Sequence, residues 1–185
     1  MGKIIRFFNY DAALTYYENS IDHMRQGSVG HDGIRIIAKP ILILSIIKGM
    51  KESKFKANRF DYDEVNALYE PLFRKYFMEG RQENLTPLCY PFYYLKTDKF
   101  WHLSWKANGS TKTETPSVSW IRRNVDHAYI DEELWLMLNN DTYADKLKEY
   151  LVNIKIVQQL HSIELAAEPT RHADLKSFLT LLLAI

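Results

Sequence analysis

The segment from Cys89 to Leu103, CYPFYYLKTDKFWHL, interleaves aromatic side chains with cations. Its cations are Lys96, Lys99 and His102, and its aromatic residues are Tyr90, Phe92, Tyr93, Tyr94, Phe100 and Trp101. Aromatic rings can stack on nucleobases and nearby cations can neutralise phosphates, so such a strip can bind a polyanion. The same residues can instead form a buried corner, because most aromatic side chains lie inside proteins. The residues alone leave both interpretations open.

Further cations stand where a phosphate could be held. Lys39 precedes Pro40 at the expected start of an apolar helix, where free backbone N–H groups and a cation make a phosphate site. Arg35 could join this site or pair with Asp32. A Gly/Ser/Thr loop over residues 107–116 can enter a DNA groove, where flanking cations reach guanine edges or phosphates. These cations are Lys106, Lys112, Arg122 and Arg123. The alternatives are a solvated lysine and an ordinary surface loop.

No catalytic constellation is recognisable in the chain. The six histidines show no His-Glu-x-x-His spacing, and neither a Gly-x-Ser-x-Gly nor a phosphate-binding Gly-Lys-Ser/Thr motif occurs. The neighbours His31–Asp32 and Asp126–His127 could be metal-ligand pairs, although such pairs are common by chance. The acidic run 131–133 could bind a cation, but we expect it to cap a helix N-terminus, where negative charge is favourable. We therefore expect no catalytic residues, no metal and no cofactor in this chain.

Hydrophobic periodicity predicts mostly helices. They are expected over residues 10–26, 41–50, 61–77, 131–138, 142–160 and 170–185, with a strand over 100–105. Pro71 falls inside the third helix and predicts a kink or a break. The aromatic segment is expected to form a hairpin or a tight helix-to-strand corner. The fold class is therefore α+β, a mostly helical single domain with a small antiparallel β-sheet or hairpin. Residues 1–155 would form this domain and residues 156–185 a C-terminal helical extension of unknown role.

Composition supports a folded protein. The chain has 185 residues, of which 46% are hydrophobic and 14% aromatic, and this argues against disorder. Its single cysteine, Cys89, excludes an intrachain disulfide and a cysteine-based zinc site. The start MGKIIRFFNYD lacks the features of a signal peptide, and the apolar end LTLLLAI is too short to cross a bilayer. We expect a cytoplasmic protein without a membrane partner.

Charge is unevenly distributed although the formal net charge is only +1. Residues 1–60 hold ten Lys/Arg against five Asp/Glu, and residues 96–127 hold six against three. Residues 131–168 hold three Lys/Arg against eight Asp/Glu. Such asymmetry suits a protein that turns one face toward a polyanion. A dipolar surface with no partner is the alternative.

Three segments carry a resemblance to a known family. A basic residue and proline precede an aliphatic run (residues 39–44, KPILIL), an aromatic block follows (residues 91–103, PFYYLKTDKFWHL), and an acidic helix start comes later (residues 131–135, DEELW). In this order they resemble the N-terminal DNA-reading domain of bacterial HNH-type restriction endonucleases, which includes sulfur-binding domains that read phosphorothioate-modified DNA. The resemblance covers roughly residues 5–153, and the aromatic block is its most specific part.

The resemblance implies double-stranded DNA, phosphorothioate-modified in some members, as the partner. In sulfur-binding members a nonpolar pocket surrounds a Tyr-Pro dipeptide and a small residue three positions later. Here Tyr90 and Pro91 match, but the third position holds Tyr94, which could fill the pocket or line one of another shape. Ala38 stands where the family tends to have Arg or His. No HNH motif occurs, so the nuclease domain would lie elsewhere in the full-length protein or on another chain.

A protein-interaction or regulatory domain without DNA binding is the alternative function. In this interpretation the aromatic segment is core. The acidic helices and the apolar residues 178–183 then dock a partner chain, and a homodimer would fit such docking.

Overall fold

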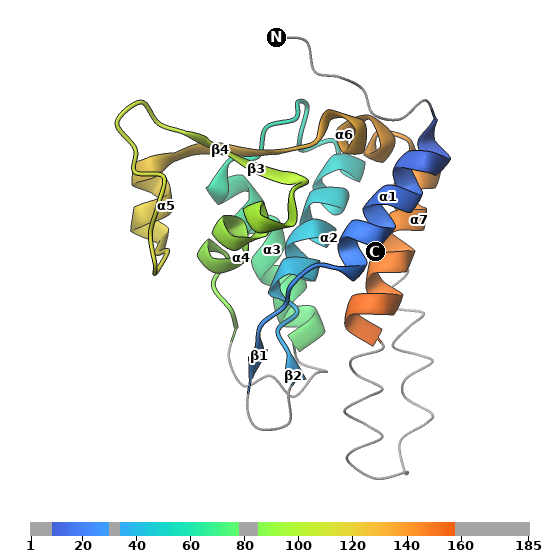
Figure 1. Ribbon diagram of the computed structural model, residues 1–185, viewed down its shortest axis with the longest axis horizontal. Helices are drawn as coiled ribbons and strands as arrows, with labels where there is room; N and C mark the ends of the chain where they lie inside the picture. Colours follow the sequence, from blue (N-terminus) through green and yellow to red (C-terminus); the bar gives the residue numbers. More distant parts are fainter. Residues whose placement is uncertain (1–8, 30–33, 78–84, 158–185) are drawn as a thin grey trace.

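The computed structural model describes residues 9–29, 34–77 and 85–157 (Figure 1). Its α-helices are α1 (Tyr10–Asp22), α2 (Ala38–Lys51), α3 (Tyr62–Phe77), α4 (Cys89–Tyr94), α5 (Val118–Asn124), α6 (Glu132–Leu138) and α7 (Asp141–Val152). A 3-10 helix η1 (Leu95–Asp98) follows α4 and a π-helical segment η2 (Asn153–Val157) follows α7. Two antiparallel pairs join β1 (Ser28–Val29) with β2 (Ile34–Arg35), and β3 (Trp101–Trp105) with β4 (Val125–Ile130). This confirms a mostly helical α+β fold with a small antiparallel sheet.

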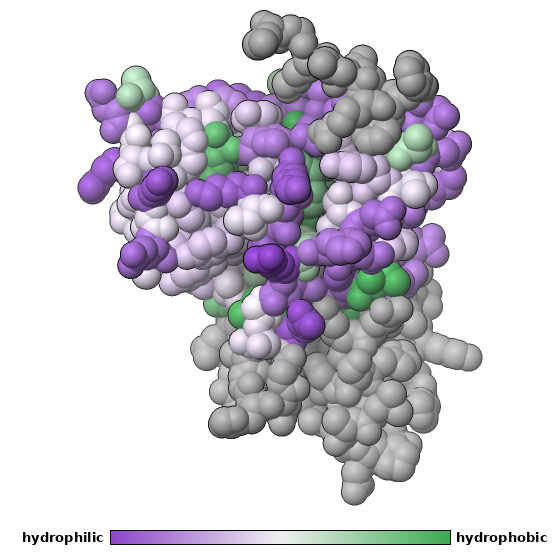
Figure 2. Space-filling model, in the orientation of Figure 1, coloured by the Kyte–Doolittle hydropathy of each residue, from purple (hydrophilic) through white to green (hydrophobic). Residues whose placement is uncertain are grey.

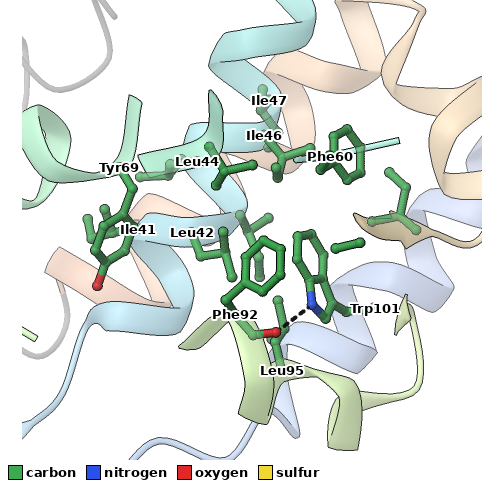
Figure 3. Close-up of a cluster of buried hydrophobic side chains, with 14 of the residues drawn as sticks. Ile41, Leu42, Leu44, Ile46, Ile47, Phe60, Tyr69, Phe92, Leu95 and Trp101 are labelled. Carbon is green, nitrogen blue, oxygen red and sulfur yellow. Dashed lines mark hydrogen bonds between the residues drawn. The ribbon is translucent and has the colours of Figure 1, made fainter. Parts of the chain in front are cut away.

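Helix α2 lies at the centre of the core, as its apolar sequence predicts. It contacts α3, α4 and α7, and Ile41 and Leu42 are fully buried (Figure 3). Near its end, a Cβ on Gly49 would lie 2.2 Å from the Phe55 ring. A side chain at this position would displace that ring, so glycine lets the chain after α2 pack closely against the helix.

Helix α3 runs through Pro71 without a break. Of the kink or break predicted at Pro71, the break does not occur, because proline removes one backbone donor but does not remove the apolar face of the helix. That face is buried and anchors both halves of α3; it includes Val65, Leu68, Leu72, Phe73 and Tyr76.

The aromatic segment forms a helix-to-strand corner, one of its two predicted forms. The chain leaves η1 through Lys99, whose φ of 67° is left-handed, and enters β3. The buried Trp101 indole donates a hydrogen bond of 2.9 Å to the Phe92 carbonyl (Figure 3). The ring of Phe60 stacks on Trp101 with a centroid distance of 5.8 Å. The corner is therefore built around Trp101.

Strand β3 pairs directly with β4, although the loop and helix α5 separate the two strands in sequence (Figure 1). Trp101 lies opposite Ile130 and His102 opposite Tyr129, with a bulge between Ser104 and Trp105. The periodicity of residues 118–123 was ambiguous, and they form α5, which Ser117 caps by accepting a 3.1 Å hydrogen bond from the Trp120 amide. The strand over 100–105 is confirmed, whereas no prediction covered β4.

Helix ends depart modestly from prediction. The sequence offers Asn9 or Asp11 as the cap of α1; Asn9 is the cap, and the helix ends at Asp22 rather than near residue 26. For α7 the sequence offers Thr142 or Asp141 as the cap, but Asn140 takes this position. Gly30 and Gly33 favour a loop over residues 28–38, but this stretch contains the β1–β2 pair. The helix predicted over 170–185 lies outside the described residues. Within the described ranges, none of the helices is long and apolar enough to cross a bilayer.

Candidate nucleic-acid interface

The largest group of predicted site residues lies at the end of the molecule that carries α4 and α5. The loop between β3 and α5 is fastened to α4 there. Tyr94 donates a 2.7 Å hydrogen bond to the Glu114 carbonyl, and the Thr113 amide donates one of 3.1 Å to the Tyr93 hydroxyl. We call this surface the α4–α5 end; its predicted residues are Tyr90, Tyr94, Lys96, Lys106, Lys112, Arg122 and Arg123.

Most cations of the α4–α5 end keep their positive charge uncompensated. Lys112 and Arg123 are exposed, and in the described part of the chain neither has an ion pair. Lys106 donates a 2.7 Å hydrogen bond to the Arg122 carbonyl, which orients its ammonium without cancelling the charge. Arg122 pairs with Asp63 at 2.8 Å, and both side chains are more than half exposed. An exposed pair of this kind is weak and can be rearranged by a phosphate.

The surface of the α4–α5 end is hydrophilic rather than hydrophobic. At the left of Figure 2, over the end that carries α5, hydrophilic residues alternate with residues of intermediate hydropathy. The intermediate class includes tyrosine and tryptophan, and Tyr90 and Tyr94 are among the exposed large side chains. Mixed cations and aromatic rings are the composition expected of a nucleic-acid surface.

The three predicted pocket residues are not equally accessible. Tyr90 and Tyr94 lie one helical turn apart on α4 and are 41% and 36% exposed. Pro91 lies between them in sequence but is buried. The Tyr94 hydroxyl is fixed by Glu114, so its ring is held in place on the surface. Any ligand at this point meets two tyrosine rings first.

A second group surrounds Asp98 of η1. The Lys39 ammonium lies 2.5 Å from an Asp98 carboxylate oxygen, and the two side chains are only 12% and 7% exposed. The Arg25 amide donates to the other carboxylate oxygen at 3.3 Å. Lys39 is thus held by a carboxylate instead of standing open to a phosphate. The exposed Arg35 and Lys99 flank this pair in sequence, and the suggested partner of Arg35, Asp32, lies outside the described residues.

His102 belongs to a third group. It alternates along β3 with Trp101 and Leu103, which are buried, so it faces the other side of the β3–β4 pair. Its Nε2 lies 2.7 Å from an Asp131 oxygen, and the Tyr17 hydroxyl donates to the second oxygen at 3.2 Å. The His102 ring also stacks on Tyr129 at 5.0 Å. The sequence also suggests that His102 and Lys99 could reach the same phosphate backbone as Lys39; this stays a prediction, and in the structure His102 is engaged with Asp131.

The acidic run 131–133 lies at a helix N-terminus, as predicted. Asp131 stands at the N-cap position of α6 and Glu132 and Glu133 lie in its first turn, but the Asp131 side chain makes no capping hydrogen bond. The carboxylate is 8% exposed and bonds to Tyr17 and His102 instead. Sequence reasoning missed this network because its members lie 29 and 114 residues apart, and neither spacing carries a local signal.

The paired Asp126 and His127 also have an internal partner. His127 Nδ1 lies 2.8 Å from an Asp126 oxygen and 2.8 Å from the Arg59 guanidinium. Arg59 lowers the pKa of Asp126 through its hydrogen bond, with His127 as the next contributor. A guanidinium at this distance repels a metal cation.

The residues that carry the family resemblance are mainly structural. The buried residues of the aromatic block include Phe92, Leu95, Phe100, Trp101 and Leu103, and residues 41–44 of the aliphatic run are also buried. Asp98 is the partner of Lys39. No model of a known protein family matches the chain, and no curated protein matches it significantly in sequence. Function must therefore be argued from the exposed side chains.

Proposed function

We propose that this chain is a DNA-binding module that contacts the duplex with its α4–α5 end. The observation that carries the proposal is that five cations lie on segments linked to α4, which carries two exposed tyrosine rings. Lys96 contacts the Tyr93 ring, the loop is bonded to Tyr94, and Lys106 donates to the Arg122 carbonyl. The five cations are Lys96, Lys106, Lys112, Arg122 and Arg123. They come from η1, the loop and α5, so the fold brings together charges that are up to 27 positions apart in sequence.

Electrostatics favour a polyanion at this surface. Among the described residues, Asp63 is the one carboxylate that pairs with these cations. Clustered cations with so little compensation attract phosphates and release counterions when DNA binds. Arginines at the end of a short helix can also reach guanine edges.

The finer proposal is that the module reads phosphorothioate linkages for an HNH-type restriction endonuclease. Its support is the resemblance of residues 91–103 and the apolar rings of Tyr90 and Tyr94. Sulfur is larger and less well hydrated than phosphate oxygen, so contact with apolar rings favours it by desolvation. Because Tyr94 is anchored to Glu114, the sulfur would rest against its ring.

A protein-interaction role is the second candidate. The observation that favours it is the exposure of Leu136 on α6, at 43%, and of Tyr10 on α1, at 41%. Tyr10 also contacts the Tyr143 ring at 5.1 Å, so apolar surface from α1 and α7 is continuous there. The apolar residues 178–183 lie outside the described residues.

The test is a fluorescence anisotropy titration with one duplex, prepared with and without phosphorothioate linkages, at two salt concentrations. Binding that weakens with salt supports the DNA module. A preference of about tenfold for the modified duplex, or ~1.4 kcal/mol, supports sulfur reading. Equal, salt-sensitive affinities would mean a DNA-binding module that does not read the sulfur, and no binding to either duplex would favour the protein-interaction role. For variants that remove a positive charge from the α4–α5 end, such as Arg123→Gln, the matched control is Lys146→Gln on α7.

A further inference from the structure

Three aromatic rings meet beside Lys96. Tyr93 of α4 and Trp120 of α5 have centroids 5.3 Å apart at 88°, and Trp105 of β3 lies 6.2 Å from Trp120 at 76°. Rings that meet nearly at right angles form walls rather than a stack. We call Tyr93, Trp105 and Trp120 the aromatic cage.

The cage holds a cation in this structure. The Lys96 ammonium lies 3.5 Å from the centroid of Tyr93 and 5.5 Å from that of Trp105. Both distances are within the ~6 Å range of attraction between a cation and a ring face. Among the described residues Lys96 has no carboxylate partner, so its ammonium keeps its charge and is held by the two rings and by a hydrogen bond to the Tyr93 side chain.

The walls are held in place from several sides. The Tyr93 hydroxyl accepts from the Thr113 amide, and Asn124 bonds both the Ser110 amide, at 2.6 Å, and the Trp120 carbonyl, at 2.8 Å. A Cβ on Gly109 would lie 2.4 Å from the Asn124 carbonyl oxygen, so glycine lets the loop approach α5 closely. The cage is therefore formed before any ligand arrives.

The cage opens to solvent, and its occupant can leave. Trp105, Trp120 and Lys96 are each only partly buried. Lys96 lies on the short helix η1, and its four-carbon stem can swing outward without any change in the backbone. An external cation could then take its place between the rings.

We propose that the aromatic cage is a binding site for an alkylated ammonium group, and that Lys96 occupies it in the absence of ligand. A tethered lysine competes at an effective concentration in the ~mM range. The ligand must therefore gain more from the rings than a primary ammonium does. Methyl groups weaken the hydration of an ammonium and add contact with the rings, which is why aromatic cages select quaternary ammonium ions. The inference does not depend on DNA binding.

The test uses tetramethylammonium chloride as the probe, with sodium chloride at equal ionic strength as the blank. Binding is followed by tryptophan fluorescence and by ¹H NMR contacts between the probe methyl groups and indole protons. We expect Lys96→Ala to bind the probe about tenfold more tightly than the wild type, because the internal competitor is gone. Lys99→Ala removes a neighbouring lysine that makes no ring contact, and it should leave the affinity unchanged.

The double variant Lys96→Ala with Trp105→Leu should lose this gain in affinity, because Trp105→Leu removes one of the two ring faces, Tyr93 and Trp105, that Lys96 contacts. Circular dichroism establishes whether this variant is folded, and if it is not, the NMR contacts of Lys96→Ala locate the probe. The proposal is overturned if Lys96→Ala does not bind, or if the bound probe contacts indole protons other than those of Trp105 and Trp120. Choline and Nε-trimethyllysine, titrated into Lys96→Ala, then distinguish a small metabolite from a modified protein as the source of the ammonium.

Discussion

Lys39 and Asp98 form a nearly buried ion pair, with the Lys39 Nζ 2.5 Å from the Asp98 Oδ2. It joins the first turn of α2 to the corner that follows α4, 59 residues later. Both residues stand in segments that carry the family resemblance. Their pairing means that these segments owe part of their pattern to folding rather than to ligand contact.

Asp98→Asn should strongly destabilise the protein. The change leaves the Lys39 ammonium nearly buried without a counter-charge, and breaking such a pair costs about 3–5 kcal/mol. Chemical denaturation followed by circular dichroism measures the loss. Glu70→Gln breaks the exposed pair between Glu70 and Arg74 and should cost less than about 0.5 kcal/mol. Equal losses in the two variants would show that the buried pair contributes no more than a surface pair.

Tyr17→Phe should weaken the network around Asp131. Removal of the hydroxyl deletes one of the hydrogen bonds that this buried carboxylate accepts, which costs about 1–3 kcal/mol. The ring remains, so its packing in the core is preserved. Thermal or chemical unfolding measures the change, and Tyr90→Phe on the exposed face of α4 is the control. If the two variants unfold alike, the Tyr17 hydroxyl does not stabilise the network.

The protein should lose stability above pH 10. Burial raises the pKa of Tyr76 to about 12, whereas an unfolded tyrosine titrates near 10. The folded state thus holds the proton more tightly, and this contribution is complete below pH 10 and lost as the pH rises from about 10 to about 12. At pH 11 the loss from this residue is about 1.4 kcal/mol.

Tyr76→Phe tests this pH dependence. The variant cannot ionise at residue 76, so its free energy of unfolding should fall less than that of the wild type between pH 8 and pH 11. Denaturant titrations at the two pH values give the comparison. Tyr90→Phe, on the exposed face of α4, should behave like the wild type. If Tyr76→Phe loses as much stability as the wild type, the effect belongs to other tyrosines, such as the partly buried Tyr150, whose pKa desolvation and a hydrogen bond to Asp22 raise to about 12.

If the α4–α5 end binds DNA, Arg123→Gln should reduce the salt dependence of binding. Each phosphate contact contributes roughly 0.9 to the slope of log affinity against log salt. Losing one contact should lower the slope by about that amount and weaken modified and unmodified duplexes alike. Lys146→Gln should leave the slope unchanged, because Lys146 lies on α7 and not in the α4–α5 end. A slope reduced as much in Lys146→Gln would place the DNA elsewhere.

Elements with strong local signals were predictable. The apolar run 41–50 predicts the buried α2, and alternation over 100–105 predicts β3. Asn9 is one of two candidate caps for α1, with Asp11, and it is the cap in the structure. These signals are local because the spacing of apolar residues and the position of a capping side chain can both be recognised within a few turns of chain. A helix break was not found at Pro71, because the local cost of the proline is outweighed by packing of the apolar face of α3 against other parts of the chain.

The candidate site was predictable only as a set of residue types. The sequence determined that cations and aromatic residues are interleaved between residues 89 and 123, and it supplied the apolar runs that bury the core. Tertiary structure decided which cations are available: Asp98 takes Lys39, Asp131 takes His102, two ring faces hold Lys96, and Arg123 stays exposed. The physical reason is that a charge is neutralised by whatever lies within a few ångströms, and that distance is set by chain folding rather than by spacing along the sequence.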